Sequence, residues 1–245
     1  LFPDGSNTGS QWFKDTETRA EAISGSLFVS ASSAGWNHML RSKQTFNRTD
    51  DHIFVADVRL PGGTGAETSS LQMIGFGNHY YTDTKLLELG GNENWYSGSA
   101  HMFYLYHSSI NIYEGSGSLG THLNNITDYN PGDKLRFWIK PNTEEKGARY
   151  QVFKHPNLSG SILDYNSKDH SKARQDHELD VRITGYRNTK TTAIDNIQVT
   201  APGVPSTVIE GDKITTGKLR SVNWGASYGS QFDLNEGTFK LGGDA

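Results

Sequence analysis

An alternation of apolar and polar residues with a period of two is the feature that most constrains what this chain can fold into. Between His52 and Leu60, one face of an extended chain collects apolar residues only: Phe54, Ala56, Val58 and Leu60. The ranges 134–140 and 178–186 repeat the pattern, with apolar residues alternating against mostly polar or charged ones. Because successive side chains of a β-strand point to opposite faces, the pattern predicts strands half-buried in packed sheets.

Further segments have the β-branched and aromatic content of strands, and they cover residues 26–30, 71–75, 85–89, 101–107, 109–114, 150–154 and 194–200. Turn signals separate the segments, namely Pro61-Gly62-Gly63, Gly90-Gly91-Asn92, Gly115-Ser116-Gly117 and Asn130-Pro131-Gly132-Asp133. No segment holds a sustained 3.6-residue period with helix caps, although Glu17 to Ile23 leaves room for one or two helical turns. Many short strands at this spacing predict an all-β sandwich of two packed sheets.

Composition and charge exclude several classes of function. The formal net charge of −4 gives no general attraction to nucleic acid or to an anionic membrane. The absence of cysteine excludes disulfides, thiolate zinc sites and a cysteine nucleophile. No apolar run approaches the roughly 18 residues that span a bilayer, so we expect no membrane insertion. The chain begins Leu1-Phe2-Pro3 without a methionine, and we expect a fragment of a longer protein or a processed product.

The run Pro202-Gly203-Val204-Pro205 ends the sandwich pattern. We therefore predict a sandwich domain over residues 1–201, a linker over 202–205 and a separate β-rich segment over 206–245. The last segment is small, polar and Gly-rich, and about forty such residues cannot bury enough surface to fold alone. Its isolated apolar residues predict a homotrimer in which three chains bury them together; the alternative is an extension that wraps its own sandwich.

Several stretches of the first 200 residues occur in a characteristic order. They are Ile23-Ser24-Gly25-Ser26-Leu27-Phe28-Val29, Leu40-Arg41-Ser42-Lys43, residues 54–61, and the closing run Ala193-Ile194-Asp195-Asn196-Ile197-Gln198-Val199. This order resembles the concanavalin-like lectin/glucanase superfamily, whose closing strand often reads Ile-Asp-Asn-Ile-x-Val. The resemblance implies a two-sheet jelly-roll sandwich that binds or cleaves glycans, because this fold hosts lectins, hydrolases and lyases.

The C-terminal segment carries a second set of motifs. Gly211-Asp212-Lys213-Ile214-Thr215-Thr216-Gly217 precedes Gln231-Phe232-Asp233-Leu234 and Gly237-Thr238-Phe239-Lys240-Leu241. These runs resemble segments of tail-fibre and tail-tip proteins of tailed bacteriophages, which commonly form intertwined trimeric β-structure. The resemblance implies a virion component in the phage tail, in an extracellular setting, with other copies of itself, other tail proteins and a bacterial surface polysaccharide as partners.

A sugar site needs aromatic rings to stack on pyranose faces and planar polar groups to meet hydroxyls. The densest supply lies in three places: His79-Tyr80-Tyr81, Asn92-Glu93-Asn94-Trp95-Tyr96, and the strand with Tyr104 and Tyr106. Phe103 and Leu105 mark the core face of that strand and leave Tyr104 and Tyr106 outward. The candidate carbohydrate-binding residues are Asn94, Trp95, Tyr96, His79, Tyr81, Tyr104 and Tyr106; the alternative for each ring is that it fills the sandwich.

Catalytic and metal-binding motifs are incomplete. A jelly-roll lyase would use Tyr or His as the base and Arg or Gln to neutralise the uronic carboxylate of the substrate. The chain offers Arg59, Gln72, His79 and Tyr104. The run Ser70–Ile74 resembles the Gln-x-His strand of alginate lyases, but Ile74 occupies the position of the histidine. The closing Tyr-x-Lys-x-Gly-x-Tyr motif of those lyases is also missing. The paired carboxylates of a glycoside hydrolase are also missing. Asp4, Asp50, Asp51 and Asp195 are candidates for a structural Ca²⁺, without an assigned ligand set, and no other cofactor is expected.

These observations favour a structural phage-tail component whose sandwich binds host-surface carbohydrate. Two alternatives stay open at this point. One is a jelly-roll polysaccharide lyase or depolymerase, and the other is a ligand-free spacer domain of the tail.

Overall fold

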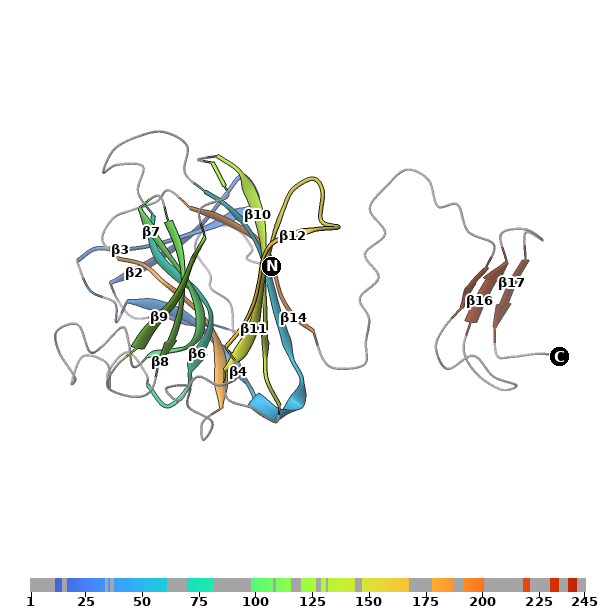
Figure 1. Ribbon diagram of the computed structural model, residues 1–245, viewed down its shortest axis with the longest axis horizontal. Helices are drawn as coiled ribbons and strands as arrows, with labels where there is room; N and C mark the ends of the chain where they lie inside the picture. Colours follow the sequence, from blue (N-terminus) through green and yellow to red (C-terminus); the bar gives the residue numbers. More distant parts are fainter. Residues whose placement is uncertain are drawn as a thin grey trace. The chain divides into compact units, whose positions relative to one another are not determined.

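The computed structural model describes residues 12–14, 17–33, 35, 38–60, 70–81, 98–107, 109–115, 120–126, 129–130, 132–143, 147–167, 178–186, 192–200, 218–220, 230–233 and 238–241. The chain divides into two compact units, Leu1–Val204 and Pro205–Ala245. In the first unit two antiparallel sheets lie one on the other (Figure 1). None of the helical structure in the described ranges has the length and apolar character needed to cross a membrane.

Sheet A has the strand order β1-β4-β13-β6-β7-β8-β9. Its strands are β1 (Trp12–Lys14), β4 (Met39–Phe46), β6 (Ser70–Asn78), β7 (Ser99–His107), β8 (Ser109–Gly115), β9 (Gly120–Ile126) and β13 (Leu179–Thr184). A 3-10 turn, η1 (Arg48–Asp50), follows β4.

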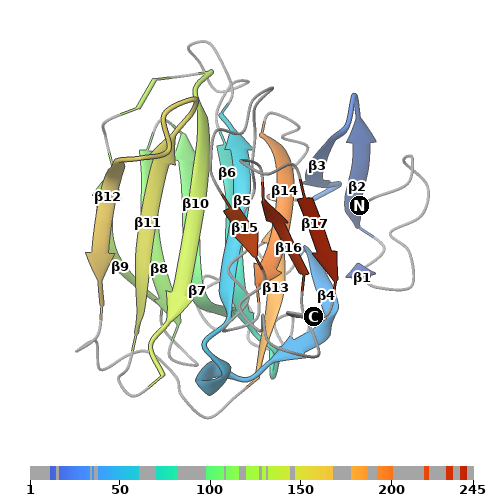
Figure 2. The ribbon, with the colours of Figure 1, turned by 90° about the vertical axis from the view of Figure 1, so that its right-hand side faces the viewer.

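Sheet B has the strand order β12-β11-β10-β5-β14-β3-β2, and Figure 2 shows it from the side that faces away from sheet A. Its strands are β2 (Thr18–Ile23), β3 (Ser26–Ala31), β5 (Ile53–Arg59), β10 (Lys134–Pro141), β11 (Ala148–Lys154), β12 (Ser161–Asn166) and β14 (Ala193–Thr200). Non-consecutive strands are neighbours in both sheets, which is the connectivity of a jelly roll rather than of a simple meander.

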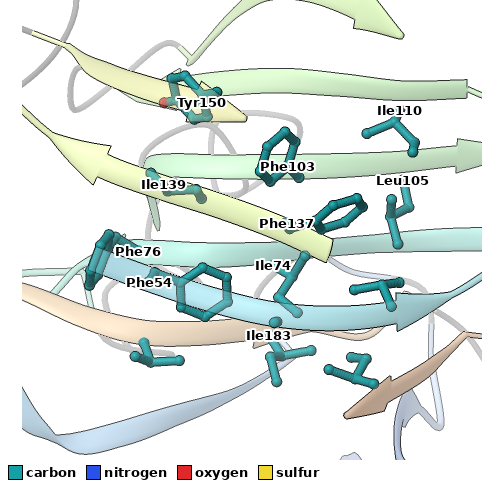
Figure 3. Close-up of a cluster of buried hydrophobic side chains, with 14 of the residues drawn as sticks. Phe54, Ile74, Phe76, Phe103, Leu105, Ile110, Phe137, Ile139, Tyr150 and Ile183 are labelled. Atoms are coloured by element: carbon teal, nitrogen blue, oxygen red, sulfur yellow. The ribbon is translucent and has the colours of Figure 1, made fainter. Parts of the chain in front are cut away.

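The core lies between the two sheets, where the apolar residues of the period-two pattern meet (Figure 3). Phe103 of sheet A and Phe137 of sheet B stack with their ring centroids 4.4 Å apart. Phe54 and Phe76 meet edge to face at 5.9 Å across the same interface. All four rings are fully buried, and each such side chain contributes about 1.5–3 kcal/mol of transfer free energy.

A polar cluster is enclosed within this apolar layer. We call it the interior cluster; its members are Arg48, His101, Glu114, Tyr150 and Ser167. Glu114 Oε1 accepts hydrogen bonds from Tyr150 (2.7 Å) and Ser167 (2.6 Å), and it lies 3.0 Å from His101 Nδ1. The guanidinium of Arg48 contacts His101 Nε2 on the other side of the ring. The cluster joins η1, β7, β8 and β11 and so ties the two sheets together.

The strands predicted from alternation at 52–60, 134–140 and 178–186 are confirmed as β5, β10 and β13. Predictions at 26–30, 71–75, 101–107, 109–114, 150–154 and 194–200 are likewise confirmed, as β3, β6, β7, β8, β11 and β14. The strand predicted at 85–89 lies outside the described residues. The sequence reading also missed β1, which has three residues. It missed β4, β9 and β12 as well, which are more polar and carry a weaker alternation.

The helical turns considered for Glu17 to Ile23 are wrong, because this range contains strand β2. Ala, Glu and Arg favour helix by intrinsic propensity, and this local preference points to helical turns. Instead, β2 pairs along its whole length with β3, from Thr18 opposite Ala31 to Ile23 opposite Ser26. Sheet pairing and the packing of Ala20 on the core therefore override the local preference.

The second unit contains a small antiparallel sheet in the order β15-β16-β17. Its strands are β15 (Lys218–Arg220), β16 (Ser230–Asp233) and β17 (Thr238–Leu241). The register sets Leu219 opposite Phe232, and Phe232 opposite Phe239. Leu219, Phe232 and Phe239 thus occupy facing positions across the three strands.

Candidate functional site

A buried ion pair lies on the face of sheet A that points away from the core. Asp180 and Arg182 alternate along β13 with the core residues Val181 and Ile183. Arg182 donates from Nε to Asp180 Oδ1 (3.0 Å) and from Nη2 to Oδ2 (2.8 Å). Both side chains are at most 1% exposed. We call these two residues the anchor pair.

Gly77 of β6 makes room for the anchor pair. It lies directly opposite Asp180 in the register between β6 and β13. A Cβ at this position would lie 2.3 Å from Arg182 Nε and 2.6 Å from Asp180 Oδ1. Since real Cβ atoms do not approach so closely, the absence of a side chain lets the ion pair lie flat on the sheet.

The anchor pair holds the turn Asn78–Tyr81, which we call the rim turn. Arg182 donates to the carbonyl oxygens of Tyr81 (2.9 Å), Asn78 (3.2 Å) and Gly98 (3.2 Å). The turn is closed by the backbone N–H of Tyr81, which donates to the Asn78 carbonyl at 3.0 Å. One buried guanidinium therefore fixes both ends of the turn and the chain just before β7.

His79 connects the rim turn with the buried carboxylate. Its Nδ1 lies 3.3 Å from Asp180 Oδ2, and its side chain is 34% exposed. Burial by itself would raise the pKa of Asp180, but the charge of Arg182 and the hydrogen bonds from His79 and Arg182 outweigh it, so the pKa lies below its ordinary value. Asp180 thus remains ionised and orients the imidazole, which is partly exposed to solvent.

Two tyrosine rings complete the surface of the rim turn. Tyr80 and Tyr81 meet edge to face with their centroids 5.0 Å apart, and Tyr80 is 48% exposed. An exposed ring beside an imidazole and phenolic hydroxyls offers both a stacking surface and polar groups. This combination suits a ligand with apolar faces and many hydroxyls.

A second cluster covers the same face of sheet A farther along β6 and β7. It consists of Met73, Met102, Tyr104 and Tyr113, with Tyr186 packed against it. Tyr104 is edge to face with Tyr113 at 4.9 Å. These side chains lie opposite the core residues Phe103 and Leu105, as the alternation predicts, but Tyr104 is only 5% exposed. Tyr104 thus lies on the outer face, as predicted, but neighbouring side chains bury it there.

The structure brings together only some of the predicted site residues. His79 and Tyr81 lie in the rim turn, whereas Tyr104 lies in the buried cluster farther along β6 and β7. Tyr106 is described only as a backbone position of β7, and Asn94, Trp95 and Tyr96 lie outside the described residues. The sequence reading missed the anchor pair, because it placed Asp180 and Arg182 on the polar face of their strand. The available signal was the Gly75-Phe76-Gly77 spacing in the neighbouring strand.

The residues considered for a lyase do not converge. Gln72 points inward and donates to the Val29 carbonyl of the opposite sheet, whereas His79 and Tyr104 lie on the outer face of sheet A. Arg59 belongs to β5 of sheet B. A base and a neutralising group must reach the same sugar ring, and these four side chains lie on different surfaces.

Two of the acidic residues considered for calcium are held by cations. Asp51 pairs with Lys140 at 2.6 Å, and Asp195 with Lys134 at 3.7 Å. Asp50 accepts from Asn47 at 3.0 Å, and Asp4 lies outside the described residues. Within the described ranges no three His, Asp or Glu side chains are grouped so as to hold a metal ion.

No protein-family model matches the chain, and no curated protein matches it either. Solved structures do match. The VIP36 exoplasmic/lumenal domain, solved with Ca²⁺ and mannose, gives a TM-score of 0.53 at 9% identity, covering 83% of this chain and 88% of that one. A Lotus tetragonolobus seed lectin gives 0.52 at 8% identity, covering 80% and 95%. A protein of unknown function from Shewanella oneidensis MR-1 gives 0.50 at 10% identity, covering 77% and 75%. The fold is therefore that of the lectin-like jelly-roll sandwiches.

Proposed function

We propose that the sandwich is a carbohydrate-binding module and that the rim turn is part of its sugar site. The observation that carries the proposal is the exposed ring of Tyr80, presented beside His79 on a turn that the buried anchor pair fixes. A rigid turn loses little conformational entropy when a ligand binds. The fold adds support, because VIP36, which shares it, was solved with mannose.

The chemistry of the rim turn favours binding over cleavage. Stacking on Tyr80 and hydrogen bonds from His79 and the tyrosine hydroxyls can hold a pyranose. Cleavage would require a base and a charge-neutralising group at the same ring, and the candidate groups Gln72 and Arg59 lie on other surfaces. We therefore propose a lectin-like function without glycan turnover.

The test is a binding measurement on matched ring deletions. The intact chain is screened on an array of bacterial surface polysaccharides, and the best ligand is titrated by calorimetry. Tyr80→Ala should raise Kd by about tenfold or more, the effect of losing an aromatic anchor. Phe13→Ala removes a ring of similar exposure, 45%, from β1 of sheet A and should leave Kd unchanged.

Three results would overturn this assignment. A parent protein that binds nothing on the array would favour the spacer interpretation. Release of an unsaturated uronate, detected by its ultraviolet absorbance, would favour the lyase. Equal losses for Tyr80→Ala and Phe13→Ala would remove the rim turn from the site.

We further propose that the module is carried on a bacteriophage tail, outside the cell, where it touches the host surface. Support comes from the resemblance of residues 211–243 to tail-fibre segments and from the separate unit Pro205–Ala245. The row of Leu219, Phe232 and Phe239 is too small to form a core in one chain, so we propose that three copies bury it together.

Light scattering tests the assembly. The intact chain should have the mass of a trimer, and Phe232→Ser should shift it to a monomer while the circular dichroism of the sandwich is retained. A monomeric intact chain at micromolar concentration would refute the trimer without affecting the sugar site.

A further inference from the structure

Sheet B contains an irregularity that opens a groove. Strand β14 follows β5 along its length, but a bulge separates Asp195 from Gln198. On its other side β14 pairs with β3 at one position, Ile194 opposite Leu27. The β2–β3 turn at Ser24 and Gly25 lies next to this point, with φ values of 50° and 84°. A groove of about 770 Å³ lies between this turn and the bulge, within the ~300–1,000 Å³ typical of small-molecule sites.

The bulge gathers polar side chains on one side of the groove. Asp195, Asn196 and Gln198 all line it, because the extra residue breaks the strict alternation of the strand. Asn196 has a φ of 49°, a left-handed conformation that asparagine tolerates better than most residues. Such a conformation persists only where neighbouring contacts fix it.

Those contacts come from a buried carboxylate. Asn196 Nδ2 donates to Asp57 Oδ2 at 2.7 Å, and Arg136 donates to both oxygens of Asp57 at 2.8 and 3.1 Å. His155 Nε2 lies 3.1 Å from Asp57 Oδ1, and Asp57 is 1% exposed. Asp57 therefore fixes the bulge much as Asp180 and Arg182 fix the rim turn.

Other residues that line the groove are less polar. Trp12 lines it and is also packed against the core, so the indole is held in place. Small residues of the β2–β3 hairpin, among them Ala22, Gly25 and Ser26, leave the space beside it open. The lining therefore combines an indole with amide, carboxylate and hydroxyl groups, which together suit stacking and hydrogen bonding to a sugar.

The charge of the groove argues for an uncharged ligand. Among the described lining residues, Lys134 and Asp195 are the ionisable ones, and they face each other at 3.7 Å. Lys134 also lies 3.6 Å from Asp57. Because Lys134 already lies between the carboxylates of Asp57 and Asp195, the groove offers no net attraction to an anionic sugar.

We propose that this groove binds a short neutral oligosaccharide, at a second site separate from the rim turn. The sugar ring rests against Trp12, and its hydroxyls exchange hydrogen bonds with Asp195, Asn196 and Gln198. The two sites belong to different sheets, so each binds its own stretch of glycan. The groove does not depend on the rim turn and can be tested without it.

NMR spectra of the backbone amide and indole N–H groups of the intact chain distinguish the two sites. The protein is titrated separately with maltotriose, cellotriose and mannotriose, and with trigalacturonate as the acidic counterpart. At least one neutral trisaccharide should shift the amide signals of residues 24–26 and 195–198 and the Trp12 indole. Trigalacturonate should bind there at least about fivefold more weakly.

Variants assign the shifts to the groove. Gln198→Ala and Asp195→Ala should each raise the Kd of the groove about fivefold or more, without changing the spectrum elsewhere. Gln151→Ala alters another glutamine of sheet B, one that bonds Asp164 at 2.9 Å, and should have no effect. Tyr80→Ala should also leave the groove unaffected.

The proposal fails if none of the neutral sugars shifts residues 24–26 and 195–198, or if trigalacturonate binds the groove as tightly as they do. Shifts confined to residues 78–81 would refute the groove but support the rim turn. Shifts confined to residues 24–26 and 195–198 would support the groove and count against the rim turn.

Discussion

The interior cluster and the cluster around the anchor pair both contain a carboxylate, an arginine and a histidine. In the interior cluster they are Glu114, Arg48 and His101, and on the outer face of sheet A they are Asp180, Arg182 and His79. Both carboxylates are fully buried. The difference is the histidine, which is 1% exposed in the interior cluster and 34% exposed at the rim turn.

The members of the interior cluster bond mainly to one another. Because a guanidinium can only donate, Arg48 fixes His101 Nε2 as the acceptor and leaves the proton on Nδ1, toward Glu114. Burial lowers the pKa of His101, and the charge of Arg48 adds to this effect, so the ring is neutral. Burial would raise the pKa of Glu114, but hydrogen bonds from His101, Ser167 and Tyr150 lower it below its ordinary value.

The comparison shows that a group of titratable residues is not by itself a binding site. Inside the sandwich each partner contacts another protein group, and the cluster joins the sheets. At the rim turn the same chemistry supports a surface, because His79 and Tyr80 reach solvent. Access, rather than residue type, distinguishes the site from the structural network.

The largest effect should come from Arg182→Met. This change leaves Asp180 charged and buried, and it removes three hydrogen bonds to the rim turn and Gly98. Breaking a buried pair in this way costs about 3–5 kcal/mol, measured as the free energy of unfolding in urea. Arg149→Met is the control, because Arg149 binds Asp164 with similar geometry but is exposed; it should cost at most about 1 kcal/mol. Similar losses in both variants would mean that the buried pair has no special role.

The interior cluster should lose stability in mild acid. The unfolded chain protonates His101 near pH 6.5, whereas the folded chain resists because its pKa is lowered. The unfolded state therefore binds more protons, and stability falls as pH drops below about 6.5, by at most about 1.4 kcal/mol per pH unit for this one proton. Urea unfolding at pH 8, 7, 6 and 5 measures the slope. His101→Gln should be less stable at pH 8 and have a shallower slope between pH 6.5 and 5; an unchanged slope would show that another group causes it.

Much of the fold follows from the sequence because it depends on local alternation. The placement of Phe54, Phe103 and Leu105 in the core was predictable from period two alone. The resemblance of the closing run near Asp195 to concanavalin-like domains gave the jelly-roll expectation, and solved structures of this fold match.

The burial of the anchor pair was not predictable in the same way. Asp180 occupies a polar position of its strand, and only the missing Cβ of Gly77 and the carbonyls of Asn78 and Tyr81 make its burial favourable. These partners are about 100 residues away in sequence. Tyr104 illustrates the same limit, since alternation gives its face but not its exposure.

The smallest effect on stability should come from His79→Ala, and it tests the comparison directly. Asp180 keeps both hydrogen bonds from Arg182 after this change, so the loss is that of one net hydrogen bond, about 1 kcal/mol. That corresponds to a fall in Tm of about 2–4 °C for a domain of this size. His101→Ala should cost more, because it removes a donor to buried Glu114 and one acceptor of the Arg48 guanidinium, which also donates to the Gly147 carbonyl. For sugar binding the order should reverse, since His79 lies at the rim turn and His101 has no access to a ligand. Melting curves and calorimetric titrations on both variants give the two rankings; equal loss of stability with equal binding would show that both histidines are structural.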